Sequence, residues 1–356
     1  MTTLICLIVF VAIWGLLVYN SNTKKRVKNS LFLIGSFISM WYVHSMVDPN
    51  SILDLPTYQE AFTSIRRTPW KALPNHWAHE TGGINMEMGY LYFNKIIGLI
   101  TSNFTFFLWI FSFVMLYAYF KTIRKYSPYV FLSVLILLLM PYGQSLFVIR
   151  QHMAMALLFS SIPLIIERKL IPFLLVIGVI FYSVHHSCLV FLPVYFIYGF
   201  KGKRLIWALI ISMGIIASFW SIITLISIYL DYEAFTMESS SEYANVSTFI
   251  QMLLFLVLYI FALGKDLVQD GINKLCFCIL AISVFLNGMS LGLNLGRLAM
   301  YYNVIAILSV PLSLKYIHNA QLRYVLGLSI VLLLLIQALY GSNSQYYEDM
   351  QLLSLF

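Results

Sequence analysis

Two arginines stand in unusual places for so apolar a chain. Arg150 lies in FVIRQHMAMALL and Arg297 in NLGRLAMYY, and an apolar segment begins directly after each of them. A helix amino terminus offers free N–H groups and a positive dipole end, and a guanidinium adds a bidentate donor. Two such groups together would suit a phosphate or diphosphate. The alternative is an ordinary charge at the membrane edge, which costs about 0–1 kcal/mol.

A pair of adjacent histidines could move a proton. His185 and His186 occur in FYSVHHSCLVFLP, between two apolar segments. A histidine at a membrane edge can accept a proton near neutral pH or hydrogen-bond a phosphate oxygen. It can equally belong to a simple polar turn. The His/Glu spacing of a zinc motif is absent from the sequence, so we expect no metal.

A third group combines side chains that hold sugars. Glu87, Tyr90 and Asn94 would share one face of a helix and present a carboxylate, a phenol and an amide. A helix cap at Glu87 is the simpler alternative. Further along the chain, Tyr301 and Tyr302 would either extend the same pocket or serve as aromatic residues of the membrane interface.

The elements that must position these residues are membrane helices. Of the 356 residues, 61% are hydrophobic and only 10% are charged, with a mean hydropathy of +0.85. Soluble domains carry about a quarter charged residues, so that class is excluded. The apolar segments are too long and unbroken for a β-barrel. The sequence therefore predicts an all-α polytopic protein with about twelve spans and a re-entrant or interfacial helix at 86–100. The predicted spans are 3–20, 31–47, 104–120, 129–147, 151–166, 170–184, 187–200, 205–229, 249–264, 275–293, 298–315 and 324–340.

The loops between these spans alternate in charge. One set contains 16 of the 22 Lys and Arg residues but only 3 of the 14 acids. By the positive-inside rule this set is cytoplasmic, which accounts for the net charge of +8 without a nucleic-acid partner. We therefore expect one integral membrane domain, 1–356, whose two long loops both face outward. These are 48–103, with its amphipathic helix, and 230–248. A catalytic site would face outward as well.

The order of these features resembles the EpsG branch of the Wzy-type polysaccharide polymerases. The strings that carry the resemblance are INMEMGYLYFNKII, QSLFVIRQHMAMALLF, FYSVHHSCLVFLPVY and GRLAMYYNVIAILSVPL, in that order, within about residues 48–315. The matching positions are Glu87, Arg150 with Gln151, His185 with Ser187, and Arg297. The duplicated histidine leaves His185 and His186 as alternatives. The family's D..Y element has a longer gap here, between Asp54 and Tyr58.

The resemblance implies a GT-C-like glycosyltransferase at the outer, periplasmic face of the bacterial inner membrane. It would move a growing glycan from undecaprenyl diphosphate to a repeat unit on a second such lipid, without a cofactor. A chain-length regulator and a flippase are the candidate partners. The implied catalytic residues are His185, Glu87, Arg150 and Arg297, with His185 or Glu87 as the base. The diphosphate would contact Arg150, Arg297, His186 and Gln151. The glycan would contact Tyr90, Asn94, Asp54, Tyr301 and Tyr302.

Three other functions stay open. An O-antigen ligase-like transferase would use similar chemistry on a different acceptor. Another membrane transferase, such as an acyltransferase, is suggested by the two histidines. A transporter of lipid-linked glycans is disfavoured, because it needs polar residues at mid-depth and the predicted spans are almost free of charge there.

Overall fold

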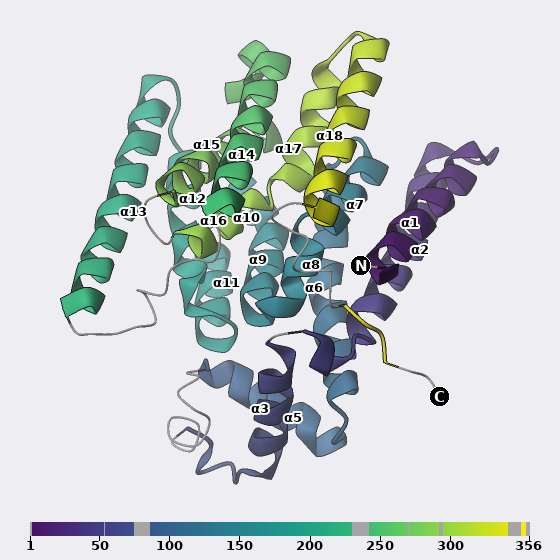
Figure 1. Ribbon diagram of the computed structural model, residues 1–356. Helices are drawn as coiled ribbons and strands as arrows, with labels where there is room; N and C mark the ends of the chain where they lie inside the picture. Colours follow the sequence, from purple (N-terminus) through teal and green to yellow (C-terminus); the bar gives the residue numbers. More distant parts are fainter. Residues whose placement is uncertain are drawn as a thin grey trace.

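The computed structural model describes residues 2–52, 54–74, 86–229, 242–269, 271–291, 295–340 and 350–353. Within these ranges the chain is helical, and its only extended pairing is an isolated bridge between Val47 and Leu352. Figure 1 shows a large body of helices, with α3 (Leu55–Arg67) and α5 (Met88–Ile100) lying together beyond one of its ends. The predicted all-α class is confirmed.

The body contains fifteen of the described helices, which include the candidates to cross the membrane. In chain order they are α1 (Thr2–Asn20), α2 (Lys25–Ser45), α6 (Phe104–Tyr126), α7 (Val130–Leu139), α8 (Pro141–Phe147), α9 (Ile149–Ser160), α10 (Ile162–Ile166), α11 (Leu170–Ser183), α12 (Leu192–Tyr198), α13 (Lys203–Tyr229), α14 (Glu242–Leu263), α15 (Ile272–Met289), α16 (Gly296–Asn303), α17 (Ala306–Tyr316) and α18 (Ala320–Tyr340). The described residues also include the 3-10 turns η1 (Pro49–Ser51), η2 (His186–Phe191) and η4 (Gly264–Val268).

Counted by helix length and apolar composition, the spans are fewer than the sequence predicts. Within the described residues, six helices are long and apolar enough to cross a membrane, or seven if the bent pair α16–α17 counts as one. Every predicted span corresponds to a helix or to two short ones, but several are shorter than a bilayer requires, such as the 14 residues of α11. The count of twelve and the GT-C-like arrangement stay predictions.

Prolines explain why several predicted spans are broken. Pro141 is the first residue of α8, and Pro163 and Pro193 each occupy the second position of their helix, α10 and α12. A proline fits the first turn of a helix because its missing N–H would have no partner there, but it interrupts a helix that is already running. The predicted spans 151–166 and 187–200 are therefore each made of two short pieces, whereas α7 and α8, although separate, together form one of the six candidate spans.

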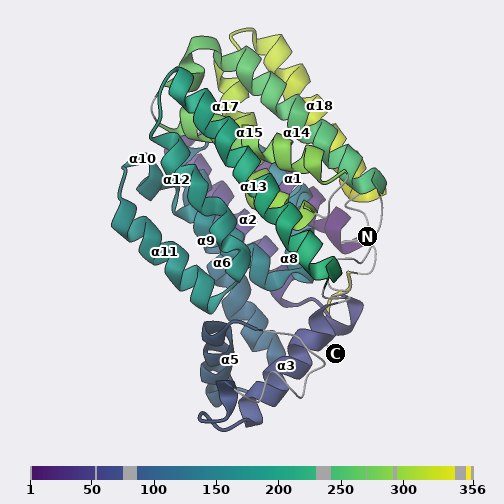
Figure 2. The same ribbon diagram turned by 90° about the vertical axis from the view of Figure 1, so that its left-hand side faces the viewer.

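The two helices beyond the body form a small cap. They are α3 (Leu55–Arg67) and α5 (Met88–Ile100), and they pack against each other at one end of the molecule in both views (Figures 1 and 2). α3 is amphipathic: Phe62 and Ile65 are buried, while Gln59 and Glu60 are exposed. The helix predicted at 86–100 is thus present as α5. The second predicted outer loop, 230–248, lies mostly outside the described residues, and α14 already begins at Glu242.

A close contact joins the cap to the body. At Gly89 in α5, a Cβ atom would lie 2.4 Å from the Cα of Ser183 at the end of α11. Only glycine, which has no Cβ, permits this approach. The residues that flank the contact are Glu87 on the cap side and the turn at 185–186 on the body side. The fold therefore brings two of the sequence-predicted groups together at the cap–body junction.

Candidate active site

Glu87 is the centre of a cluster of charged side chains. It precedes α5 in an extended conformation, with φ −63° and ψ 139°, and its side chain is only 3% exposed. The carboxylate makes no capping hydrogen bond to α5. Glu87 thus occupies the N-cap position of α5, but its side chain does not cap the helix and points across the junction to other elements.

Three donors from two other segments meet this carboxylate. Arg150 Nη1, from the start of α9, donates to Oε2 at 2.5 Å. His185 Nδ1 donates to Oε1 at 2.8 Å, and the backbone N–H of His186 donates to the same oxygen at 3.2 Å. His186 Nδ1 lies farther away, at 3.7 Å. Both oxygens of the carboxylate thus accept hydrogen bonds, and the group links the cap to α9 and to the turn before η2.

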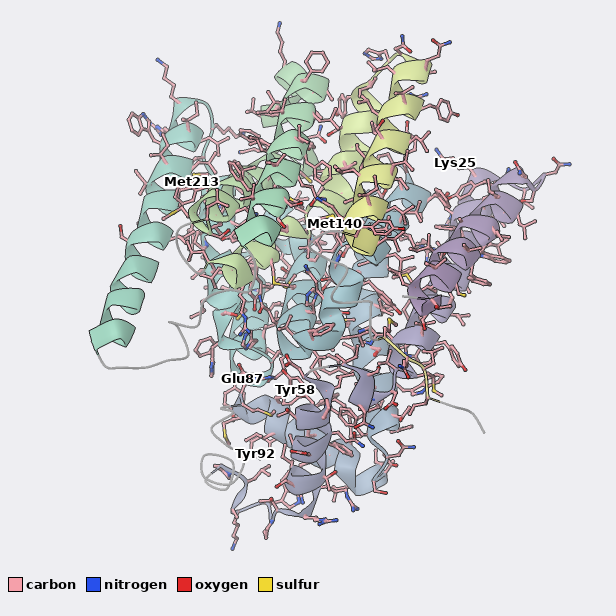
Figure 3. The ribbon with its side chains drawn as sticks, in the orientation of Figure 1. Lys25, Tyr58, Glu87, Tyr92, Met140 and Met213 are labelled. Atoms are coloured by element: carbon pink, nitrogen blue, oxygen red, sulfur yellow. The ribbon has the colours of Figure 1, made fainter. Side chains whose placement is uncertain are left out.

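Two tyrosines surround the guanidinium of Arg150. Its carbon Cζ lies 5.9 Å from the ring centre of Tyr58 in α3 and 5.6 Å from that of Tyr90 in α5. The Tyr58 side chain also hydrogen-bonds the guanidinium. Figure 3 shows Glu87 and Tyr58 where the cap meets the body. Arg150 is therefore held by both helices of the cap, with 11% of its side chain exposed.

The electrostatics keep Glu87 ionised. Burial by itself would raise the pKa of this carboxyl group. The hydrogen bond from His185 and the positive charge of Arg150 outweigh burial and lower the pKa to about 2. Near neutral pH the group is a carboxylate whose oxygens are already occupied. Glu87 therefore suits an orienting role better than that of a proton acceptor.

His185 is the side chain best arranged to accept a proton. In the neutral imidazole, the hydrogen that Nδ1 donates to Glu87 leaves the lone pair on Nε2, a tautomer that we infer from the hydrogen bond. Within the described part of the chain no hydrogen bond occupies Nε2, and the side chain is 29% exposed. His186 is 58% exposed, with its ring 4.6 Å from that of Phe181. A carboxylate that holds a histidine by Nδ1 is the arrangement by which hydrolases orient a general base.

The backbone of the second arginine, Arg297, lies near the start of α9 in space, although the two arginines are far apart in the sequence. Gln151 Nε2, on the residue after Arg150, donates to the carbonyl oxygen of Arg297 at 2.5 Å, so that α9 and α16 begin side by side. The Arg297 side chain is exposed. Its charge opposes the rise that burial causes in the pKa of the Asp54 carboxyl. Arg297, Gln151 and Asp54 thus lie near the cluster, but of the two predicted arginines only Arg150 is bound into it.

Four predicted glycan contacts are buried side chains. Tyr90, Asn94, Tyr301 and Tyr302 are each at most 2% exposed. Asn94 Nδ2 donates to the carbonyl of Tyr90, the Tyr301 and Ser187 hydroxyls lie 2.9 Å apart, and the Tyr302 hydroxyl donates to the carbonyl of Val190. Of these four, Tyr90 contacts the cluster, through the guanidinium of Arg150. Nowhere in the described ranges do three His, Cys, Asp or Glu side chains form a group suited to a metal.

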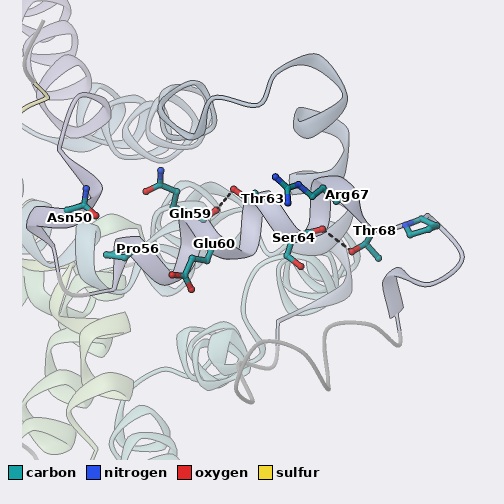
Figure 4. A pocket seen from close by; sticks show the side chains of 9 residues that line it. Asn50, Pro56, Gln59, Glu60, Thr63, Ser64, Arg67 and Thr68 are labelled. Carbon is teal, nitrogen blue, oxygen red and sulfur yellow. Dashed lines mark hydrogen bonds between the residues drawn. The ribbon is translucent and has the colours of Figure 1, made fainter. Parts of the chain in front are cut away.

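The sequence interpretation missed a polar hollow on the cap. It measures about 680 Å³ and lies along the outer face of α3 (Figure 4). Its walls carry amide, hydroxyl and charged groups. The side chains include Asn50, Gln59, Glu60, Thr63, Ser64 and Arg67. The exposed polar residues of an amphipathic helix are usually solvated, so the sequence pattern alone did not distinguish them.

Comparison with known proteins identifies a family. The sequence profile of the EpsG family matches residues 31–354. No curated protein and no solved structure matches the chain. The match includes every helix of the cap and every residue of the cluster. Since it spans nearly the whole chain, the protein belongs to the EpsG family, which is associated with polysaccharide polymerase-like membrane proteins.

Proposed function

We propose that this protein polymerises lipid-linked oligosaccharide repeat units at the outer face of the bacterial inner membrane. It would transfer the growing glycan from undecaprenyl diphosphate to the non-reducing end of a new undecaprenyl-diphosphate-linked repeat unit. The family and the apolar helices support a membrane-bound polysaccharide polymerase. The observation that carries the proposal is the Glu87–His185 pair with Arg150, at the junction of cap and body.

The first chemical step assigned to the cluster is proton removal. As the acceptor hydroxyl oxygen forms its bond to the anomeric carbon, its proton passes to Nε2 of His185. The bond between that carbon and the diphosphate oxygen breaks, and the electron pair leaves with the diphosphate. Glu87 holds the ring in place and stabilises the imidazolium. A positioned general base contributes about 10²–10⁴-fold to a rate.

The leaving diphosphate needs positive charge nearby. Arg150 is already engaged by Glu87, so we assign the direct contact to the exposed Arg297 and a second contact to the exposed His186. Preorganised donors of this kind lower the barrier, and the loss of one typically costs about 3–4 kcal/mol. The hollow along α3 would receive sugar units, because its amide and hydroxyl groups match sugar hydroxyls.

The test uses cells that depend on this chain for their polysaccharide. They carry either the wild-type chain or His185→Asn, at matched protein levels. The introduced amide can still donate to Glu87, but it has no second ring nitrogen to accept a proton. His318→Asn, an exposed histidine after α17, is the matched control.

We expect His185→Asn to leave single repeat units on the final acceptor, and His318→Asn to leave polymer length unchanged. Long chains that remain on the lipid carrier would instead identify a ligase. Polymer of normal length from His185→Asn would refute the assignment of His185 as base.

A further inference from the structure

A second cavity lies at the other end of the body from the cluster. It is a groove of about 720 Å³ between the α1–α2 hairpin and α18, with α7 and the loop before it as its floor. Figure 1 shows the hairpin standing apart from α18, and Figure 3 places Lys25 at the end away from Glu87 and Tyr58. The groove takes no part in the chemistry proposed above.

The mouth of the groove is basic and polar. Lys25, at the start of α2, and Arg323, in the first turn of α18, line it from opposite walls. Asn20 and Asn29 lie at the same end, and Asn29 Oδ1 accepts a hydrogen bond from Tyr19 at 2.9 Å. No acidic side chain lines the groove within the described residues. The mouth is therefore suited to an anion.

The rest of the groove is apolar. Leu16 of α1 and Leu328 of α18 line the groove from its two walls. Their exposed fractions are 63% and 62%. Phe131, Leu135 and Val331 also line it. Because α1 and α18 are both candidate spans, their exposed faces meet acyl chains in a bilayer. The groove thus combines a cationic mouth with an apolar channel. This arrangement is complementary to a lipid with an anionic head group and apolar acyl chains.

We propose that this groove binds an anionic phospholipid of the leaflet on the basic side of the protein. Lys25 and Arg323 hold the phosphate from two sides, and the acyl chains run along α7 between α1 and α18. Basic pockets between membrane helices are known to bind anionic head groups in this way. By the positive-inside pattern this leaflet is cytoplasmic, so the lipid would be a structural ligand, distinct from a substrate that is processed at the cap.

The experiment measures lipid binding to the purified full-length protein in mild detergent. Phosphatidylglycerol is titrated in native mass spectrometry, with phosphatidylcholine as the neutral comparison. We expect phosphatidylglycerol to bind more tightly. Lys25→Gln combined with Arg323→Gln should weaken its binding by about tenfold or more, since each cation near the surface contributes favourably. Lys265→Gln, an exposed lysine outside the groove, should change nothing.

A second variant tests the apolar part. A Cβ atom at Gly327 would meet only Leu314 Cδ1, at 3.4 Å, so Gly327→Leu fills the groove without a backbone clash. It should reduce phosphatidylglycerol binding while the melting temperature is maintained. Gly178→Leu in α11, where a Cβ meets nothing within 4 Å, is the matched control.

Two results would overturn the proposal. Equal binding of the two lipids, unchanged by the charge variants, would show that the mouth does not select an anion. A change from dimer to monomer in Gly327→Leu, with lipid binding unaffected, would show that a second copy of the chain occupies the groove. Because the readout is lipid binding, failure here leaves the proposed transferase activity untouched.

Discussion

The substitution Glu87→Gln tests the cluster at its centre. It preserves the size of the side chain but removes the charge that meets Arg150 at 2.5 Å and His185 at 2.8 Å. The lowering of the Glu87 pKa from 4.5 to about 2 corresponds to about 3 kcal/mol of stability at neutral pH. Loss of one partner of a buried pair is expected to cost about 3–5 kcal/mol, because the other charge stays buried. We therefore expect a loss of about 3 kcal/mol.

The contribution of the Glu87 carboxylate to stability depends on pH in a definite direction. The pKa of Glu87 is lower in the folded protein than in the unfolded chain, so its contribution is full above about pH 4.5 and is lost as the pH falls towards about 2. Between pH 5 and 8 the contribution is constant. Any change of activity in that range must come from another group than Glu87.

Two assays follow the substitution. Thermal unfolding in detergent should show a clear fall in melting temperature, and polymer from cells at matched protein levels should fall by about 10²-fold or more, because His185 loses its orienting partner. Glu87→Gln with Arg150→Gln should recover part of the stability, since neither charge is then left alone, but no activity.

The control for charge removal is Glu167→Gln. Glu167 forms an exposed ion pair with Lys169, at 2.7 Å and outside the cluster. Exposed pairs contribute little, so no measurable change in melting temperature is expected. If Glu87→Gln keeps both the melting temperature and the polymer of the wild type, the reasoning about the cluster is refuted.

Three further substitutions separate support from chemistry. Arg297→Gln should leave the melting temperature unchanged, because the side chain is exposed, but should lower polymer synthesis in membranes about 10²-fold; unchanged synthesis would remove Arg297 from the site. Tyr58→Phe keeps the ring beside Arg150 but loses one hydrogen bond, so thermal unfolding should show a loss of about 1 kcal/mol of stability. A clearly larger loss would contradict the assignment of a single hydrogen bond to this hydroxyl. Gly89→Ala forces the cap away from α11, so it should cost about 1–3 kcal/mol of stability and reduce activity. Gly178→Ala should be neutral or slightly stabilising. Equal effects of the two substitutions would argue against the close contact at Gly89.

The sequence pointed to the main chemical groups but not to their partners. Glu87, Arg150 and His185 could be selected because they are charged or titratable residues beside apolar segments. Their contacts join positions 63 and 98 residues apart, and spacing of that size carries no information about distance. The sequence interpretation assigned Arg150 to the diphosphate, which stays a prediction, and it did not foresee the ion pair of Arg150 with the buried Glu87. A buried carboxylate requires such a counter-charge.

Other polar residues gave no usable signal. The resemblance singled out Tyr58 as part of the D..Y element, but nothing in the sequence marked it as a partner of Arg150. His44 is completely buried in α2 and lies 2.7 Å from the Ser112 hydroxyl and 2.8 Å from that of Ser145. These partners come from α6 and α8, and their meeting depends on how three helices pack. Residue type alone could not predict it.

The most direct measurement of the central claim uses purified protein in proteoliposomes with an undecaprenyl-diphosphate-linked repeat unit as the only sugar source. The wild-type chain should form a ladder of longer glycans and release one undecaprenyl diphosphate for each unit added, without any nucleotide sugar. Glu87→Gln and His185→Asn should bind the lipid but extend no glycan. A ladder of wild-type length from either variant would contradict the claim that the cluster of Glu87, Arg150 and His185 performs the transfer.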